Sequence, residues 1–313
     1  MPLLDRNLLV VTGKGGTGKT TVSASLAVLA ARLGKRVLIC EMDAKGSLAS
    51  AFDVGPLPYE PLEVGERLAA MAMNTEDSLR EYLRRFVHIP FVARLGVLAR
   101  TFDFVADAAP GVKEILSLGK LCYEVRERNY DLVVVDGVST GHVVAQLSAP
   151  DAIGELVRVG PVSEQTRWMQ DILEDPVRTG VVLVTTPEEM PVLETVELVD
   201  QIQTDTRVEV AAVIANRVLP ELFGRSEEAV FETFASPAAL DILRNEFGPD
   251  VDVVLEGARL AVTMRRGGAA QLEYLRSRLP AGLGVLYVPE LFSRSTGRRS
   301  VELVADALAE ELL

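Results

Sequence analysis

The chain has little of what builds disulfide-linked or zinc-bound frameworks. Only two of its 313 residues are cysteine, Cys40 and Cys122, and no C-x-x-C spacing is present. Two isolated thiols exclude a disulfide framework and a structural zinc site within one chain. We therefore expect both cysteines to be buried core residues.

Net positive charge and long apolar runs are also missing. The formal charge is −13 at pH 7, which argues against broad affinity for nucleic acid or for an anionic membrane surface. No apolar run reaches the ~18 residues needed to span a bilayer, and no export signal follows Met1. We expect a cytoplasmic protein without a nucleic-acid partner and without a membrane span.

Positive charge is concentrated in one stretch. Residues 255–300 contain eight arginines against three glutamates. Such a run is more often a solvated helical face than a binding patch, and we interpret it as a solvated face.

Apolar runs and glycine-rich turns indicate an α/β fold. With 48% hydrophobic residues, the chain can bury a large core. Buried strands are predicted at Leu8–Thr12, Arg36–Glu41, Leu132–Asp136, Val181–Thr185, Val208–Asn216 and Gly284–Val288. Because helical patterns separate these strands, we predict a mostly parallel, doubly wound sheet in a single domain over residues 1–313.

The segment between Phe52 and Asn129 has a different pattern, with no comparable strand signal. Helical periodicity is found in Asp77–Val87, Val92–Val105 and Val112–Arg128. We interpret residues 53–129 as a helical insertion subdomain. Its apolar middle, Phe86–Leu98, is either an ordinary packed core, which we favour, or an exposed groove for an apolar protein client.

A glycine-rich loop follows the first strand and precedes the first helix. Its sequence, GKGGTGKT, matches the P-loop pattern G-x-x-x-x-G-K-[ST]. In such a loop, backbone N–H groups and the helix N-terminus surround a β-phosphate, Lys19 reaches the β- and γ-phosphates, and the Thr20 hydroxyl binds Mg²⁺. The predicted nucleotide contacts here are Gly13, Lys14, Gly15, Gly16, Thr17, Gly18, Lys19, Thr20 and Thr21.

Two carboxylates and a second lysine accompany this loop. Asp43 follows the second strand and Asp136 ends a later one, so both should emerge beside the loop at the carboxyl edge of the sheet. Asp136 follows four apolar residues, as a Walker-B carboxylate that holds Mg²⁺ does, and Asp43 is placed to orient or deprotonate an attacking water. Either aspartate could instead be a turn or capping residue. Lys14 projects across the phosphates unless it is an incidental surface lysine.

Together these segments resemble the ArsA-type ATPases and the Get-pathway ATPase that delivers tail-anchored membrane proteins. Both belong to the deviant P-loop group, whose members pair face to face. The resemblance implies ATP and Mg²⁺ as ligands and a dimer in which Lys14 contacts the nucleotide of the partner, as an arginine finger does. Catalysis is then expected to depend on Lys14, Lys19 and Asp43, with Thr20 and Asp136 as the metal ligands.

Two further segments resemble the switch motifs of this family. Residues 43–48, Asp-Ala-Lys-Gly-Ser-Leu, are similar to the first switch, Asp-Pro-Ala-His-Asn-Leu, which gives Asp43 its water-activating role. Residues 136–142, Asp-Gly-Val-Ser-Thr-Gly-His, are similar to the second switch, Asp-Thr-Ala-Pro-Thr-Gly-His, which carries a metal carboxylate and the turn that senses the γ-phosphate. Lys45 in place of the histidine, and the missing prolines, imply altered switch closure.

The resemblance also predicts residues that contact the adenine ring and a segment that binds a client protein. It implies that Glu188 approaches the partner's nucleotide, that Asn216 reads the adenine edge, and that Pro289 lies in the loop covering the ring. Residues 110–114 are similar to the helical subdomain that holds client transmembrane helices. The chain most resembles single-domain ArsA-like ATPases of high-GC bacteria, some of which pair with a related second subunit, so a homodimer and a heterodimer are both open.

Three functions are compatible with these motifs. The first, which we favour, is an ATPase whose nucleotide-driven dimer closure controls the binding of a client or partner protein. The second is the energising subunit of an anion or metalloid efflux system of the arsenite type, against which the lack of thiolate ligands argues. The third is a weakly hydrolysing, ATP-binding regulatory subunit of a mixed dimer, which the altered switches favour.

Overall fold

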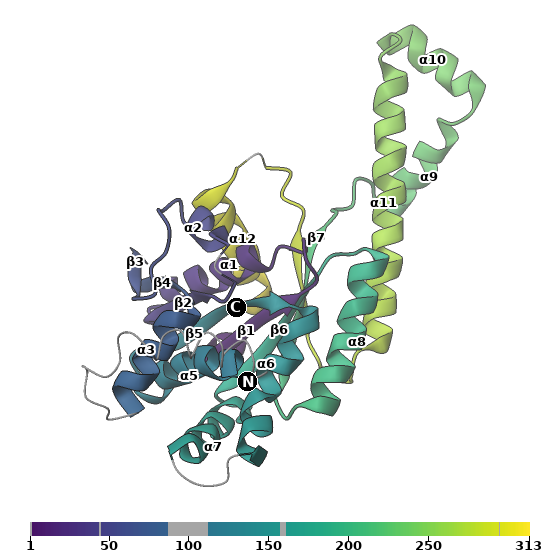
Figure 1. The fold of residues 1–313 in the computed structure, drawn as a ribbon. Helices are drawn as coiled ribbons and strands as arrows, with labels where there is room; N and C mark the ends of the chain where they lie inside the picture. Colours follow the sequence, from purple (N-terminus) through teal and green to yellow (C-terminus); the bar gives the residue numbers. More distant parts are fainter. Residues whose placement is uncertain (1, 44, 87–111, 157–160, 294) are drawn as a thin grey trace.

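An eight-stranded sheet forms the centre of the protein. The computed structural model describes residues 2–43, 45–86, 112–156, 161–293 and 295–313 (Figure 1). The strands are β1 (Leu8–Gly13), β2 (Val37–Glu41), β3 (Leu62–Gly65), β4 (Leu68–Ala72), β5 (Leu132–Ser139), β6 (Thr179–Thr185), β7 (Val210–Val218) and β8 (Val285–Pro289). Their order is β3-β4-β2-β5-β1-β6-β7-β8, and β3 and β4 form the antiparallel pair in an otherwise parallel sheet. The α/β class and the six predicted strands are confirmed.

Helices cover both faces of the sheet because the central strands are apolar on both sides. One face packs against α1 (Lys19–Arg32), α2 (Ser47–Ala51) and α12 (Gly297–Leu312). The other packs against α5 (Val112–Arg126), α6 (Thr140–Leu156), α7 (Pro161–Leu173), α8 (Glu189–Asp205) and the end of α11 (Val251–Arg278). The predicted core cysteines, Cys40 and Cys122, are both fully buried, and burial raises the pKa of the Cys122 thiol to about 12.

The region from 53 to 129 begins with two strands, so the expectation that no strand lies between Phe52 and Asn129 was wrong. β4 pairs with β2 and β3 pairs with β4, which extends the sheet at one edge. β4 reads Leu-Ala-Ala-Met-Ala and is buried along its whole length. A short run that is apolar on both faces and poor in β-branched residues has neither the alternation nor the composition that predicts a strand.

Two of the three helices predicted in this region are confirmed, as α3 (Thr75–Phe86) and α5. The predicted helix 92–105, nearly all of the apolar stretch Phe86–Leu98 and part of 110–114 lie outside the described residues. A buried cluster joins α3 to α5: Lys120 Nζ lies 3.1 Å from Glu81 Oε1 and 2.8 Å from Glu124 Oε1. Unpairing such buried charges is costly, so the cluster holds α3 against α5.

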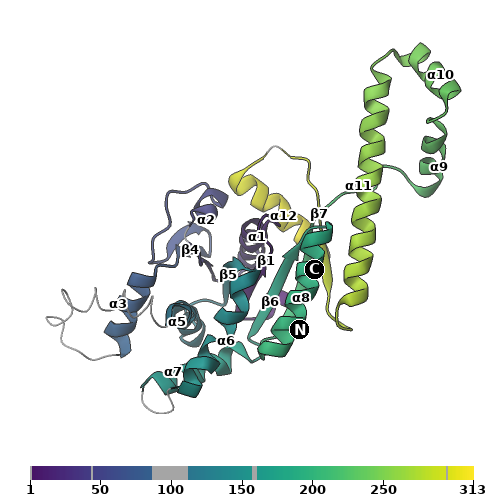
Figure 2. The same cartoon turned by 45° about the vertical axis from the view of Figure 1, so that its right-hand side comes forward.

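A helical arm that the sequence analysis did not predict leaves the sheet after β7. It consists of α9 (Arg225–Thr233), α10 (Pro237–Phe247) and the first part of the 28-residue α11. Since β7 enters the arm at its carboxyl end, the arm projects past the carboxyl edge of the sheet (Figure 1). Figure 2 shows the same arrangement from another side, with α9 and α10 on the side of α11 turned away from the sheet.

The arginine-rich stretch 255–300 lies largely on α11 and α12. Arginines of both helices pair with glutamates: Arg266 Nη2 lies 2.6 Å from Glu232 Oε1, and Arg298 Nε lies 3.3 Å from Glu302 Oε1. The described part of the stretch therefore agrees with the predicted solvated face. Across the described parts of the chain, α11 included, no helix is both long enough and apolar enough to cross a bilayer.

Candidate functional site

Glycines shape the loop between β1 and α1. A Cβ atom on Gly13 would lie 2.1 Å from the carbonyl oxygen of Val184 in β6, so no side chain fits there. At Gly15 and Gly16 the Cβ position has no neighbouring atom within 4 Å, and Gly16 has a φ of +89° that favours glycine. The loop is tight against the sheet and open on its other side. Backbone N–H groups that line such an open loop at a helix N-terminus fit a phosphate group.

Asn216 supports this loop from the end of β7. Its Nδ2 atom donates a hydrogen bond of 2.8 Å to the carbonyl oxygen of Thr17, and the residue is buried. A Cβ atom on Gly18 would lie 2.4 Å from the same nitrogen, so this glycine is required by the contact. The amide predicted to read an adenine edge therefore also positions the loop, which the sequence did not indicate.

The two lysines of the loop take different directions. Lys19 Nζ donates to the carbonyl oxygen of Lys14 at 3.2 Å, so it stays over the loop, and burial lowers its pKa. The Lys14 side chain leaves the loop and forms an ion pair with Glu194 of α8. The other carboxylate oxygen of Glu194 lies 3.5 Å from Thr140 Oγ1 at the start of α6. Glu194 was missed as a site residue, although it follows closely after Glu188, which was predicted to approach a nucleotide.

Asp136 accepts hydrogen bonds from two hydroxyl groups of α1. Thr20 Oγ1 donates to one carboxylate oxygen at 2.7 Å, and Ser23 Oγ donates to the other at 3.3 Å. Burial, with a further contribution from Glu41, raises the pKa of Asp136 to about 6. The structure thus brings together the predicted metal pair, Thr20 and Asp136. A hydroxyl and a carboxylate oxygen beside a phosphate-binding loop are the donor set that fits Mg²⁺.

Replacing Asp136 by asparagine is expected to stabilise the metal-free chain. The pKa of this carboxyl group rises from 3.8 to about 6 on folding, so its contribution to stability is complete below pH 3.8 and is lost as the pH rises through 6. Asp136→Asn should raise the free energy of unfolding by about 3 kcal/mol at pH 8 and by about half of that at pH 5. Urea unfolding in EDTA at the two pH values measures the difference.

Asp131→Asn is the matched control for this prediction. Asp131 is hydrogen-bonded by Arg36, whose guanidinium lowers the pKa of that carboxyl group. Its replacement should therefore lower stability at pH 8, which is the opposite sign. If Asp136→Asn raised the free energy of unfolding by the same amount at pH 5 and at pH 8, the proposed cost of ionising the Asp136 carboxyl group would be contradicted.

Glu41, at the end of β2, is buried beside Asp136 and was not predicted as a site residue. The two residues are partners in the β2–β5 register. Glu41 Oε1 accepts from the backbone N–H groups of Ser47 at 2.8 Å and Leu48 at 3.4 Å, which begin α2. It therefore ties the first-switch segment to the sheet. The available signal was a glutamate at the carboxyl end of an otherwise apolar strand.

Asp43 lies at the carboxyl edge of β2, as predicted, on the surface. Its Oδ2 atom accepts a hydrogen bond of 2.7 Å from Lys45 Nζ, and the two side chains are 55% and 74% exposed. Lys45 is the residue that replaces the histidine of the first-switch pattern. A role for Asp43 in activating water requires its release from Lys45.

The second-switch segment continues the sheet, so the predicted strand end at Asp136 was too early. β5 runs to Ser139 and pairs there with Gly13, and α6 begins at Thr140. Thr12 Oγ1 donates to the carbonyl oxygen of Val138 at 2.7 Å. Since the proline of the family pattern is missing, the backbone from 137 to 139 keeps the N–H groups that a strand uses.

The remaining predicted contacts lie around the same edge of the sheet. Glu188 precedes α8 and Pro289 ends β8, and both side chains are exposed. Thr21, in the first turn of α1, is half-buried. Their contacts with a nucleotide stay predictions.

The chain is similar to known proteins over the part that builds this site. The family of anion-transporting ATPases matches residues 6–160 and 154–232. The ATPase BagA of Mycobacterium tuberculosis is 34% identical over 224 residues, which cover 68% of this chain and 65% of that protein. A putative arsenical pump-driving ATPase of Halobacterium salinarum is 28% identical over 307 residues, covering 84% of this chain and 48% of that protein. An ATPase ASNA1 homolog of Entamoeba dispar is 27% identical over 249 residues, covering 67% and 76%.

The matched part falls short of the full length of these relatives, at 65% of the mycobacterial protein and 48% of the Halobacterium protein. Within this chain, the family match includes the loop at 13–20, both switch segments, Glu188 and Asn216. The resemblance drawn from those motifs is therefore confirmed. The chain belongs to the ArsA-type family of anion-transporting ATPases.

Proposed function

We propose that this chain hydrolyses ATP with Mg²⁺ and uses nucleotide-driven pairing of two subunits to control the binding of a partner protein. The observation that carries the proposal is the direction of Lys14. This side chain leaves the open phosphate-binding loop and ends in an ion pair with Glu194, where 32% of the Lys14 side chain is exposed.

The loop and its neighbours account for ATP binding. Backbone N–H groups of the open loop contact the phosphates, and Lys19 adds a positive charge over them. Thr20 and Asp136 would hold Mg²⁺, which would supply positive charge beside the phosphate oxygens. Asn216, already bonded to the loop, links adenine binding at the end of β7 to the loop conformation.

Hydrolysis then depends on groups that have to move. Asp43 orients the attacking water once it is released from Lys45. Lys14 leaves Glu194 and contacts a phosphate of the nucleotide that is bound to the partner subunit. Pairing of the subunits therefore depends on the bound nucleotide. Glu194 belongs to α8, and Thr140 Oγ1 at the start of α6 lies 3.5 Å from its carboxylate, so a change at Glu194 reaches both helices.

A second candidate function is a regulatory subunit that binds ATP and hydrolyses it poorly. The ion pair between Asp43 and Lys45 favours this function, because Lys45 binds the carboxylate that activates water in the first function. Metalloid transport is disfavoured, since both cysteines are buried and arsenite requires accessible thiolates.

Phosphate release by the purified chain, with light scattering in Mg-ATP and in Mg-ADP, tests the proposal. Turnover together with an ATP-dependent dimer supports it. Tight ATP binding without turnover or dimer formation contradicts it and supports the regulatory subunit. Stimulation of turnover by arsenite or antimonite would instead favour the efflux function.

A further inference from the structure

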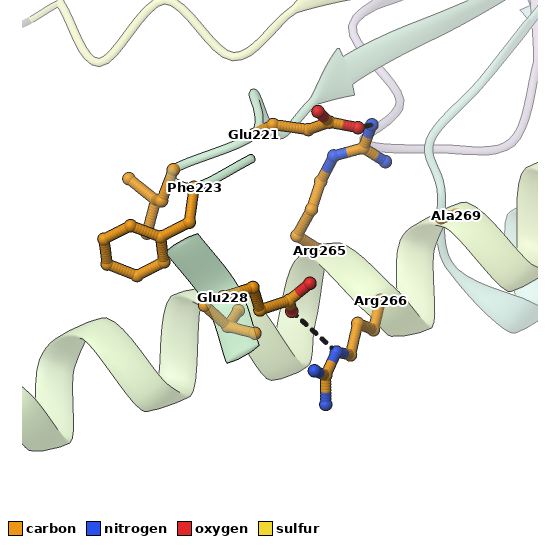
Figure 3. A pocket seen from close by; sticks show the side chains of 8 residues that line it. Glu221, Phe223, Glu228, Arg265, Arg266 and Ala269 are labelled. Atoms are coloured by element: carbon orange, nitrogen blue, oxygen red, sulfur yellow. Dashed lines mark hydrogen bonds and ion pairs between the residues drawn. The ribbon is translucent and has the colours of Figure 1, made fainter. Parts of the chain in front are cut away.

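The arm contains a cavity where its long helix α11 meets the segment that leads into α9. Residues 221–228 line one side of this cavity and residues 262–269 of α11 line the other (Figure 3). We call it the arm pocket. Its volume is about 200 Å³, below the ~300–1,000 Å³ of pockets that hold drug-sized ligands. The arm pocket therefore fits a group of about the size of one amino-acid residue.

One wall of the arm pocket is apolar and held in place. The Phe223 ring stacks on the ring of Phe231 in α9, with the ring centroids 4.8 Å apart. Phe231 is buried and also contacts Phe234 edge to face, at 6.2 Å between centroids. Leu222 lies next to Phe223 at the pocket and is 53% exposed. Because a second ring holds Phe223 in place, this wall is a preformed surface that fits an apolar group.

The two arginines of the arm pocket differ in their partners. Arg266 Nε lies 2.8 Å from Glu228 Oε1, and Arg266 Nη2 lies 2.6 Å from Glu232 Oε1. Arg265 extends toward Glu221 instead, and its Nη2 atom lies 3.8 Å from Glu221 Oε1, which is too long for a hydrogen bond (Figure 3). The buried Nε atom of Arg265 has no hydrogen-bond partner in the described part of the chain. Since a buried N–H group without an acceptor is costly, Arg265 has a donor that a ligand can satisfy.

The unpaired donor of Arg265 selects the charge of the ligand. The planar fork of a guanidinium group binds a carboxylate through two parallel N–H groups. A cationic ligand would pair with Glu221 and would leave Arg265 Nε without an acceptor. A doubly charged anion would be repelled by Glu221 and Glu228, which both line the pocket. The Glu221 side chain is 75% exposed, and such exposed ion pairs contribute little, so a single carboxylate can displace it.

We propose that the arm pocket binds a ligand that carries one carboxylate beside an apolar group. The carboxylate takes the place of Glu221 at the Arg265 guanidinium and accepts a hydrogen bond from Nε. The apolar group packs on Phe223 and Leu222. Two sources present this chemistry, a free apolar carboxylic acid and the C-terminal residue of a peptide. The site lies on the arm, outside the loop at 13–20, and it depends neither on ATP hydrolysis nor on the pairing of subunits.

Two probes that differ in one group test the carboxylate. N-acetyl-leucine should bind the full, nucleotide-free chain with a dissociation constant of about 1 mM, and N-acetyl-leucinamide, which has a neutral amide instead, should bind about tenfold more weakly or not at all. Ligand-observed NMR titration measures both affinities. A pentapeptide that ends in leucine, with a free or an amidated C-terminus, separates the two sources. Tighter binding of the free-acid peptide than of N-acetyl-leucine indicates a peptide ligand, and equal binding indicates a small acid.

Substitutions at Arg265 and Glu221 should change this affinity in opposite directions. Arg265→Gln removes the charged fork and should weaken the binding of N-acetyl-leucine about tenfold or more. Glu221→Gln removes the competing carboxylate at an exposed position, so the fold is kept and binding should strengthen about threefold. Arg259→Gln is the matched control, because Arg259 is half-buried on the same helix outside the residues that line the pocket, and its affinity should stay within about twofold. Equal binding of the acid and the amide, no binding of either acid probe, or affinities unchanged in both Arg265→Gln and Glu221→Gln would overturn the proposal.

Discussion

Lys14→Ala is expected to lower Mg-ATP turnover by about 10⁴-fold while the affinity of a single chain for ATP stays within about threefold of wild type. The reason is that Lys19 binds the phosphates of its own chain's nucleotide, whereas Lys14 acts on the nucleotide of the partner. Lys19 is held over the loop by the Lys14 carbonyl oxygen, a backbone atom that the substitution keeps. The Lys14 side chain points away to Glu194, so its removal leaves the phosphate site intact. Phosphate release and a fluorescent ATP analogue measure the two quantities.

Two controls separate this role from a general loss of the site. Lys19→Ala should remove ATP binding itself, because the charge over the phosphates is lost. Glu194→Gln should keep Lys14 and free it, since an amide does not hold the ammonium group as a carboxylate does, and should therefore strengthen the ATP-dependent dimer. Turnover of Lys14→Ala within about threefold of wild type would show that no charge from this residue is needed.

Much of this site follows from local sequence because each part is a short motif in a fixed context. The loop at 13–20 is recognisable since Gly13 and Gly18 are forced by contacts with the strands behind them. Asp136 is recognisable because four apolar residues precede it in a central strand. The parallel order of strands then places these motifs at one edge of the sheet, and the structure confirms the meeting of Thr20 with Asp136.

The parts that were missed depend on contacts between distant residues. Glu194 meets Lys14 only because α8 packs beside β1, and nothing in either local pattern states the pairing. Asn216 supports the loop across a long sequence separation, through a single amide hydrogen bond. β4 lacks alternation because both of its faces are covered. The arm was not predicted because its long helix α11 exposes apolar residues. Its sequence periodicity therefore does not separate one buried side from one polar side.

Asp43→Asn is expected to lower turnover by about 10³-fold and to leave the ATP-dependent dimer intact, so that it accumulates. The amide cannot accept a proton from water, and the side chain is exposed, so its loss disturbs no core contact. Phosphate release measures turnover and light scattering in Mg-ATP measures the dimer. Lys45→Ala is the matched variant: it removes the partner that occupies Asp43, and turnover should rise or stay the same. If Lys45→Ala is as inactive as Asp43→Asn, Lys45 takes part in catalysis, and its ion pair with Asp43 does not merely keep Asp43 from the water.

Mixing the two inactive variants decides between action within one subunit and action across two. In a mixed dimer, the Lys14→Ala subunit keeps its own Asp43 and receives Lys14 from the Asp43→Asn subunit. One of the two nucleotide sites is then complete, so the mixture should recover about a quarter of wild-type turnover if half of the dimers are mixed. If both residues acted only within their own chain, no combination of the two variants would restore a complete site. A mixture as inactive as its components, measured where mixed dimers are shown to form, would therefore place Lys14 with the nucleotide of its own subunit.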